Sequence, residues 1–217
     1  GANTTGAGNV AVGKSALTAN TTASGNTSIG HNALKTNTTG AANVSSGENS
    51  MYANTTGANN IAIGHSSLES NTTASNNTAV GKSALAANTT GETNNTAIGY
   101  YALAANTTGD SNVAVGWNVL KANTTGYYNN GIGRSALTAN TTGAHNIALG
   151  SDALKANTTA NNNVAVGNYS LTATTTGHTN TAIGSSALTT NTTGNTNIAI
   201  GSASLHQNTT GTLNVAI

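Results

Sequence analysis

The side chains that could do acid–base or metal chemistry are few and scattered along this 217-residue chain. The chain has five carboxylates, five His and no Cys. Catalysis by paired carboxylates needs two of them at a fixed separation, and a zinc site needs several His or Cys ligands close together. The sequence offers neither spacing. It therefore predicts no enzyme activity, no metal site and no cofactor. The carboxylates are Glu48, Glu69, Glu92, Asp110 and Asp152.

The charge balance excludes further classes of partner. Lys and Arg number six, the formal net charge is +1, and charged residues make up 5% of the chain. Such a composition has no basic patch for nucleic acid, so we expect no nucleic-acid partner. No apolar stretch is long enough to cross a bilayer, which predicts no membrane insertion in this segment.

Aromatic residues are the other candidates for function, because exposed rings are typical of contact sites. Five of the seven fall in one quarter of the chain, just after the stretch Glu92-Thr93-Asn94. They indicate a surface that contacts carbohydrate, another protein or a neighbouring fibre. The alternative is that tolerant positions have accepted aromatic residues by chance. The candidate contact residues are Tyr100, Tyr101, Trp117, Tyr127, Tyr128 and Arg134.

These residues are set in a repeat that covers the whole chain. The phrase Asn-Thr-Thr-Gly, two variable residues, Asn-Val-Ala-Val-Gly, two more and Ala-Leu recurs with a period of 17 residues, with one step of 18 from Asn88 to Asn106. Strict repetition places each unit in the same environment as the one before it, so it predicts a stack of identical coils. We expect one repeat-array domain over residues 1–217.

Apolar residues occupy fixed columns of the repeat. The column before the second Gly, from Val12 and Ile29 to Ile217, is predicted to form the core, with the Leu column from Leu17 to Leu205 as a second wall. A column of β-branched residues lies two positions ahead of the first.

Between the two β-branched columns lies a position that is always Ala, Ser or Gly. In a strand this side chain points away from its neighbours. Restriction to small residues predicts close packing, either against another subunit or against the opposite wall of a narrow solenoid. The alanines of this packed small column include Ala11, Ala62, Ala79, Ala97, Ala114, Ala148, Ala165, Ala182 and Ala199.

Gly and Asn mark the corners. The Gly after each Val-Ala-Val strand is constant from Gly13 to Gly201, which indicates a backbone conformation closed to other residues. The Asn before each strand is equally constant, and stacked Asn side chains can hydrogen-bond along a ladder. Such short Gly-punctuated units cannot form helix pairs. The fold class predicted is all-β, a parallel β-roll or β-solenoid with one coil per repeat, about thirteen in all, and a second strand around Ala-Leu.

The string Asn9-Val10-Ala11-Val12-Gly13 and its relatives, such as Asn197 to Gly201, resemble the head repeats of YadA-type trimeric autotransporter adhesins. The Asn-Thr-Thr-Gly version is also similar to tail-fibre-like repeats of bacterial and phage surface proteins. The resemblance implies a β-roll packed as a homotrimer and a shaft or head of an extracellular or cell-surface fibre, or a phage tail fibre. It implies attachment, to a host surface or a carbohydrate receptor, and no catalytic residues.

The repeat is also compatible with other functions. A self-polymerising extracellular filament, matrix or sheath protein would use the same repeat, and rows of Thr could form an ice-binding face. Asn-Thr-Thr fits the acceptor pattern for Asn-linked sugar, which a buried corner Asn could not receive. The repeat begins and stops without capping sequences, so we expect the chain to be an excerpt of a longer fibre.

Overall fold

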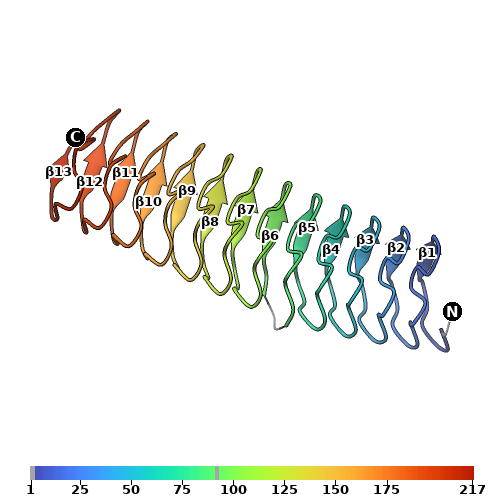
Figure 1. The fold of residues 1–217 in the computed structure, drawn as a ribbon. Coiled ribbons are helices and arrows are strands. Elements are labelled where there is room, and N and C mark those ends of the chain that lie inside the picture. The colour runs from blue at the N-terminus through green and yellow to red at the C-terminus, as the bar shows by residue number, and fades with distance from the viewer. Residues whose placement is uncertain (1–2, 91–92) are drawn as a thin grey trace. The chain divides into compact units, whose positions relative to one another are not determined.

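The computed structural model describes residues 3–90 and 93–217, which form short parallel strands joined by turns (Figure 1). Every described coil contributes one strand of two or three residues, and the described residues include no helix. The chain is therefore a parallel β-solenoid, as the 17-residue repeat predicts. The strands are β1 (Val10–Val12), β2 (Thr27–Ile29), β3 (Val44–Ser46), β4 (Ile61–Ile63), β5 (Thr78–Val80), β6 (Thr96–Ile98), β7 (Val113–Val115), β8 (Asn130–Ile132), β9 (Ile147–Leu149), β10 (Val164–Val166), β11 (Thr181–Ile183), β12 (Ile198–Ile200) and β13 (Val215–Ala216).

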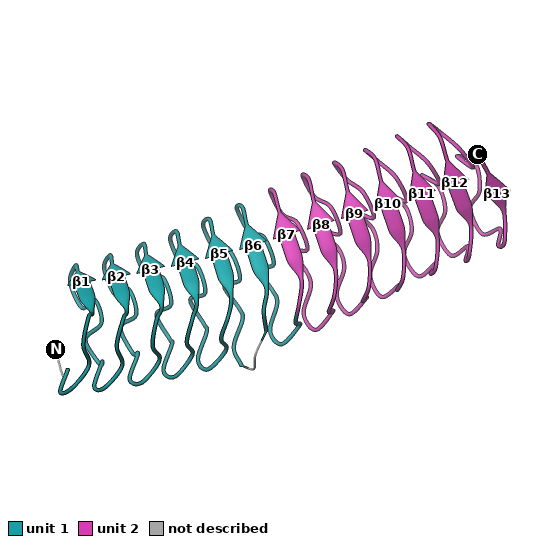
Figure 2. Ribbon diagram, turned by 180° about the vertical axis from the view of Figure 1, so that it is seen from behind, with its two compact units in different colours: residues 1–110 teal, residues 111–217 magenta. Residues whose placement is uncertain are grey.

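The chain divides into two compact units, residues 1–110 with β1 to β6 and residues 111–217 with β7 to β13 (Figure 2). Within each unit every strand pairs in parallel with the next, and equivalent residues of the repeat lie opposite one another. Val10 pairs with Thr27 in the first unit, and Val164 pairs with Thr181 in the second. Each column of the sequence thus becomes a row of stacked side chains within its unit.

The single 18-residue step leaves this register intact. Thr78 of β5 still pairs with Thr96 of β6, and the backbone N–H of Asn95 still donates to the Oδ1 of Asn77. The extra residue therefore lies in the corner loop before β6, where Thr93 also donates its hydroxyl to Asn77 Oδ1 at 2.6 Å. Glu92, in the same loop, lies outside the described residues.

The inside and outside of the coil are the reverse of the prediction. The column from Val12 to Ile217, expected to be core, faces outward: Ile29 is 43% exposed and Ile132 is 44% exposed. The small column faces inward instead. Its alanines after the first coil and before the last are fully buried, whereas Ala11, in the first strand, is exposed. Since this burial occurs within one chain, the small residues pack against the chain's own opposite wall, and the expected subunit contact at the small column is wrong.

The opposite wall of the coil is a second column of small residues, five positions later. Ser45 and Ser50 show how close the two walls come, because their Oγ atoms lie 2.6 Å apart. Ser50 Oγ also donates to the carbonyl of Ala62 in the next coil. A gap that two Ser side chains fill completely has no room for Val or Ile, which explains why the β-branched residues point to the other side.

Two consecutive coils of the second unit vary the two walls together. Gly131 in β8 replaces the usual Ala of the small column, and Val119 replaces the usual Ala or Ser of the facing column. A Cβ placed on Gly131 would lie 2.6 Å from Val119 Cγ1. Val119 is fully buried, so its extra methyl groups fill the space that the missing Ala side chain leaves. The two exceptions therefore compensate for each other.

The Leu column is buried, as predicted, but it does not belong to a second strand. The residues from each Gly to the following Asn form turns, and the described residues have one strand per coil. The leucines and Met51 take left-handed backbone angles, with φ between 48° and 53°. This conformation is uncommon for residues other than Gly, Asn or Asp. Burial of a large side chain in every coil offsets the backbone cost, and sequence reasoning did not foresee this turn.

The constant Gly column is confirmed to need glycine. At Gly64 the backbone has φ +131°, and an added Cβ would meet the carbonyl oxygen of Gly81 at 2.6 Å. Successive coils therefore approach each other here through backbone alone.

The Asn columns form the predicted ladders. Along the first, Asn54 is buried and donates its Nδ2 to Asn37 Oδ1 at 2.7 Å. Along the second, the backbone N–H of Asn60 donates to Asn43 Oδ1 at 2.9 Å, and Asn60 Nδ2 donates to the carbonyl of Ala74. Each amide thus satisfies backbone groups of its own corner and joins adjacent coils, which explains why Asn is replaced only once in the two columns, by Thr174, whose hydroxyl donates to the carbonyl of Asn191 in the next coil.

Candidate functional site

The most extended surface that could bind a partner is the outward side of the strands. The first and third residues of each strand point away from the interior, and within each unit they form two rows that we together call the apolar face. In the first unit Val10, Val12, Ile61 and Ile63 are each between 39% and 57% exposed. In the second unit the same rows include Ile183, Ile198 and Ile200, each about two-fifths exposed. The sequence had placed half of these residues in the core.

The composition of the apolar face sets it apart from the rest of the surface. None of its residues carries a charge, although Lys, Glu, His and Arg occupy the neighbouring exposed column. Most of its members are Val, Ile or Leu, and the others are Thr, Ser46 and Asn130. In each unit the exposed apolar side chains amount to on the order of 500 Å², in the range of the largest apolar patch of a typical soluble monomer. Depletion of charge in a patch of this size is typical of the centre of a protein–protein interface.

The column that directly follows the constant Gly, which we call the variable strip, is exposed from Lys14 to Arg134. In this strip His31 Nδ1 and Glu48 Oε1 lie 3.5 Å apart with both side chains about half exposed, so their interaction contributes little to stability. Trp117 lies in this strip and is 48% exposed.

The aromatic residues do not form one group. Tyr100 and Tyr101 belong to the first unit, where their rings meet edge to face at 4.3 Å. Hydrogen bonding to Tyr101 is the main cause of a raised pKa at the Tyr100 hydroxyl. The other aromatic candidates belong to the second unit, in which Trp117 follows a strand and Tyr127 and Tyr128 precede one. Trp117 therefore lies at the carboxyl ends of the parallel strands, and this Tyr pair lies at their amino ends.

Tyr127 and Tyr128 form a cluster with a residue that sequence reasoning missed, His145. The two Tyr rings meet edge to face at 5.6 Å, and the His145 ring stacks on Tyr128 at 5.2 Å. Tyr128 and His145 occupy the same position of consecutive coils, both with left-handed backbone angles. Most other coils have Gly, Asn, Ser or Thr there. The 17-residue spacing from Tyr128 to His145 was the signal that could have found this cluster.

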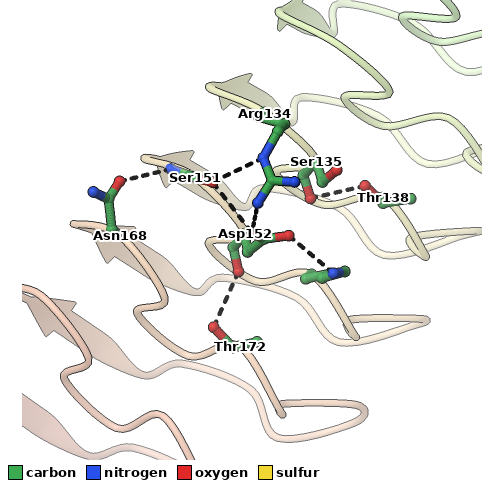
Figure 3. A network of polar contacts seen from close by, with 8 residues as sticks. Arg134, Ser135, Thr138, Ser151, Asp152, Asn168 and Thr172 are labelled. Atoms are coloured by element: carbon green, nitrogen blue, oxygen red, sulfur yellow. Dashed lines mark hydrogen bonds and ion pairs between the residues drawn. The ribbon is translucent and has the colours of Figure 1, made fainter.

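Arg134 takes part in a polar network with Asp152, which is shown in Figure 3. Arg134 Nη2 lies 2.7 Å from Asp152 Oδ2, and Lys155 Nζ lies 2.9 Å from Asp152 Oδ1. The Asp152 side chain is 4% exposed, whereas both cations are more than half exposed. Ser151 donates its hydroxyl to Asp152 Oδ2, and Thr172 of the next coil donates to the Asp152 carbonyl. This arrangement ties three coils together and leaves Arg134 engaged within the chain.

The Asp152 network makes stability depend on pH. Burial raises the pKa of Asp152, but the hydrogen bond and charge of Lys155, the hydrogen bond of Ser151 and the charge of Arg134 outweigh it, so that the pKa is lowered overall. A carboxyl group with a lowered folded-state pKa contributes stability above its unfolded pKa near 4, and that contribution is lost as pH falls through the folded value. We expect Asp152→Asn to lower the free energy of unfolding at pH 7 by about 1 kcal/mol or less, because its partners are exposed. The difference from the parent should shrink as the pH falls below the unfolded pKa near 4, because the parent loses this contribution as its carboxyl group is protonated.

Urea unfolding followed by circular dichroism at pH 7, 4 and 3 measures this difference. Glu48→Gln is the matched control, since its ion pair with His31 is exposed on both sides. A constant difference between Asp152→Asn and the parent at all three pH values would contradict the assignment.

The two Thr of the repeat have different surroundings. The first is half-buried and donates its hydroxyl to the next coil, as Thr38 does to the carbonyl of Thr55. The second, such as Thr39 or Thr56, is exposed in every described coil, so each coil presents one Thr from this phrase. The preceding Asn is buried through most of the array, in positions such as Asn37, and is hydrogen-bonded within its corner. Asn-linked sugar would therefore require the folded corner to open.

Within residues 3–90 and 93–217 there is no group of three or more His, Cys, Asp or Glu placed to hold a metal ion. The same residues enclose no pocket. None of them belongs to a helix long and apolar enough to span a bilayer. Comparison with protein-family models, with curated proteins and with solved structures found no match to this chain.

Proposed function

We propose that the chain is a structural segment of an extracellular or cell-surface fibre, in which copies of the chain pack together through the apolar face as a homotrimer. The observation that carries this proposal is the exposure of an uncharged row of Val, Ile and Leu along consecutive strands. Such rows on a soluble chain are expected to be covered by a partner. Each unit supplies about 500 Å², compared with about 800 Å² per partner in a standard interface.

A second copy of the same chain is the occupant that fits this face best. The face repeats once per coil, and another copy repeats with the same spacing, so side chains of two parallel copies meet in the same way at every level. A partner of different fold would have to match that spacing by coincidence. The face is two side-chain columns wide, so in a trimer the column of first strand residues can lie along the common axis, where equivalent residues of the three copies meet, while the other column packs against a neighbour. Three is also the number that the resemblance to YadA-type head repeats implies.

The proposed role is extension and display for attachment. The interior consists mostly of Leu, Ala, Ser and paired Asn, and no described residues form a pocket for a small substrate. The corners before the strands vary in sequence, and in the second unit they present the cluster of Tyr127, Tyr128 and His145. Exposed rings of this kind are suited to stacking on a sugar or on another protein, and a host-surface or carbohydrate receptor is the partner that we propose for them.

The mass of the chain in solution under native conditions tests the proposal. A mass of three chains is expected. Very large polymers would favour the other reading of the repeat, a self-polymerising filament, matrix or sheath protein, while a single-chain mass at micromolar concentration would contradict both.

A further inference from the structure

The apolar face of the second unit is interrupted by one amide side chain, that of Asn130. It is the first residue of β8, and the equivalent neighbours in the strands on either side are Val113 and Ile147. Asn130 is exposed on this face, and its side chain makes no hydrogen bond within the described residues. The structure of the single chain therefore gives no reason for an amide here, because Val, Ile or Thr fills the same position in the other strands of the unit.

A repetitive interface has a specific weakness. Adjacent coils are about 4.8 Å apart, and a shift of one copy by one coil brings Val, Ile and Thr opposite other Val, Ile and Thr. Apolar packing alone therefore distinguishes poorly between aligned and shifted assemblies, just as flat, uniform strands slip in register. An interface of this kind needs at least one position that is satisfied in a single alignment only.

We propose that Asn130 fixes the alignment of the copies along their common axis. This inference rests on the self-association through the apolar face proposed above. An amide carries both donors and an acceptor, so in aligned copies the Asn130 side chains can hydrogen-bond to one another. After a shift by one coil, each amide would face Val or Ile and would be buried without a partner. A single Asn in an otherwise apolar seam sets register and subunit number in coiled coils by the same physics.

Other polar residues of the face are less suited to this role. Thr occurs at Thr27, Thr78, Thr96 and Thr181 in the same column, so it marks no single coil. Its methyl group also packs like that of Val. Ser46 is the one Ser of the other column of the face. Its side chain is smaller than that of Asn130, and it is already half-buried in the single chain. Asn130 is thus the residue of the face that best distinguishes one coil of the second unit from the others.

Cysteine cross-linking tests the alignment, because the chain has no Cys of its own. Val164 and Thr181 lie in the same column as Asn130, in the consecutive strands β10 and β11. The two variants for this test are Val164→Cys and Thr181→Cys. Chains carrying one or the other substitution are refolded together in equal amounts and oxidised, and the disulfides are identified by peptide mass spectrometry. Aligned copies form 164–164 and 181–181 disulfides, whereas a shift by one coil forms 164–181 disulfides. Disulfide geometry separates these cases, since Cβ atoms must lie within about 4.5 Å.

The expected result is that 164–181 disulfides are rare with Asn130 present and rise at least about fivefold in Asn130→Val, while the native mass is unchanged. Thr96→Val, which removes a polar group from the same column of the first unit, is the control and should leave the pattern as in the parent. Equal 164–181 fractions in the parent and in Asn130→Val, at the native mass of an assembly, would overturn the role of Asn130 alone. A single-chain mass without any disulfide would instead overturn the self-association on which it depends.

Discussion

Ile183→Asp is expected to separate the assembly into single folded chains. Ile183 is 40% exposed in the third position of β11, so an Asp there remains in water in the single chain and costs little in folding. In the proposed assembly the same carboxylate would be buried among Val and Ile of a neighbouring copy. A buried charge without a partner costs about 3–5 kcal/mol, which weakens association more than about a hundredfold per site.

Native mass spectrometry and sedimentation velocity measure this loss, and circular dichroism shows whether the coils remain folded. Ser185→Asp is the matched control, because Ser185 is exposed two residues later, in the variable strip beside the apolar face. It should associate like the parent. If Ile183→Asp kept the mass of the parent assembly, the apolar face would not be the interface, and the proposed function would need another surface.

Gly131→Ala is expected to destabilise the second unit, and Val119→Ala is expected to restore the loss. The added Cβ would meet Val119 Cγ1 at 2.6 Å, and Val119 is fully buried, so it has no space into which to move. Overpacking of this kind costs about 1–3 kcal/mol. Val119→Ala alone leaves a cavity, with a cost of about 1–2 kcal/mol. The double variant recreates the Ala pair of the other coils and should unfold within about 0.5 kcal/mol of the parent.

The four proteins form a double-mutant cycle that urea unfolding can measure. The expected coupling energy between the two positions is about 2–4 kcal/mol in favour of the double variant. Additive effects would show that the two side chains do not share one space, and would place the small column somewhere other than the interior. The result bears on the fold alone, so it is independent of any assembly.

Much of the fold could be predicted because the nearly invariant positions of the repeat indicate which residue type each corner of the coil requires. A constant Gly indicated a conformation closed to other residues, and Gly64 has both the positive φ and the close carbonyl that require it. Constant Asn indicated ladders along the corners, and the bonds from Asn54 to Asn37 and from Asn60 to Asn43 form them. The turn that stands in place of the expected second strand was not predictable. Nothing in the Ala-Leu phrase indicates that a Leu such as Leu34 takes a left-handed backbone conformation.

Individual residues of the candidate site could be predicted, but not which of them lie together. Sequence position grouped Arg134 with the aromatic residues, but the fold pairs it with Asp152. It also grouped Trp117 with Tyr128, which lie at opposite ends of the strand rows, while the partner of Tyr128 is His145 one coil later. Contacts in a solenoid run across coils, so residues 17 apart are closer than many residues that are near in sequence.

The sequence by itself determined the solenoid, its 17-residue coil, its corners and the absence of charge from two columns. It also determined that side chains on either side of each Ala point the same way, because alternation along a strand is fixed by backbone geometry. Only the tertiary structure decided which of the two sides is inside. Hydrophobicity favours Val and Ile in the interior, but the distance between the two walls is set by turns and Asn ladders, and it admits Ala and Ser, or one Val where the other wall has Gly. The apolar columns are therefore left on the surface, where a second copy of the chain can cover them.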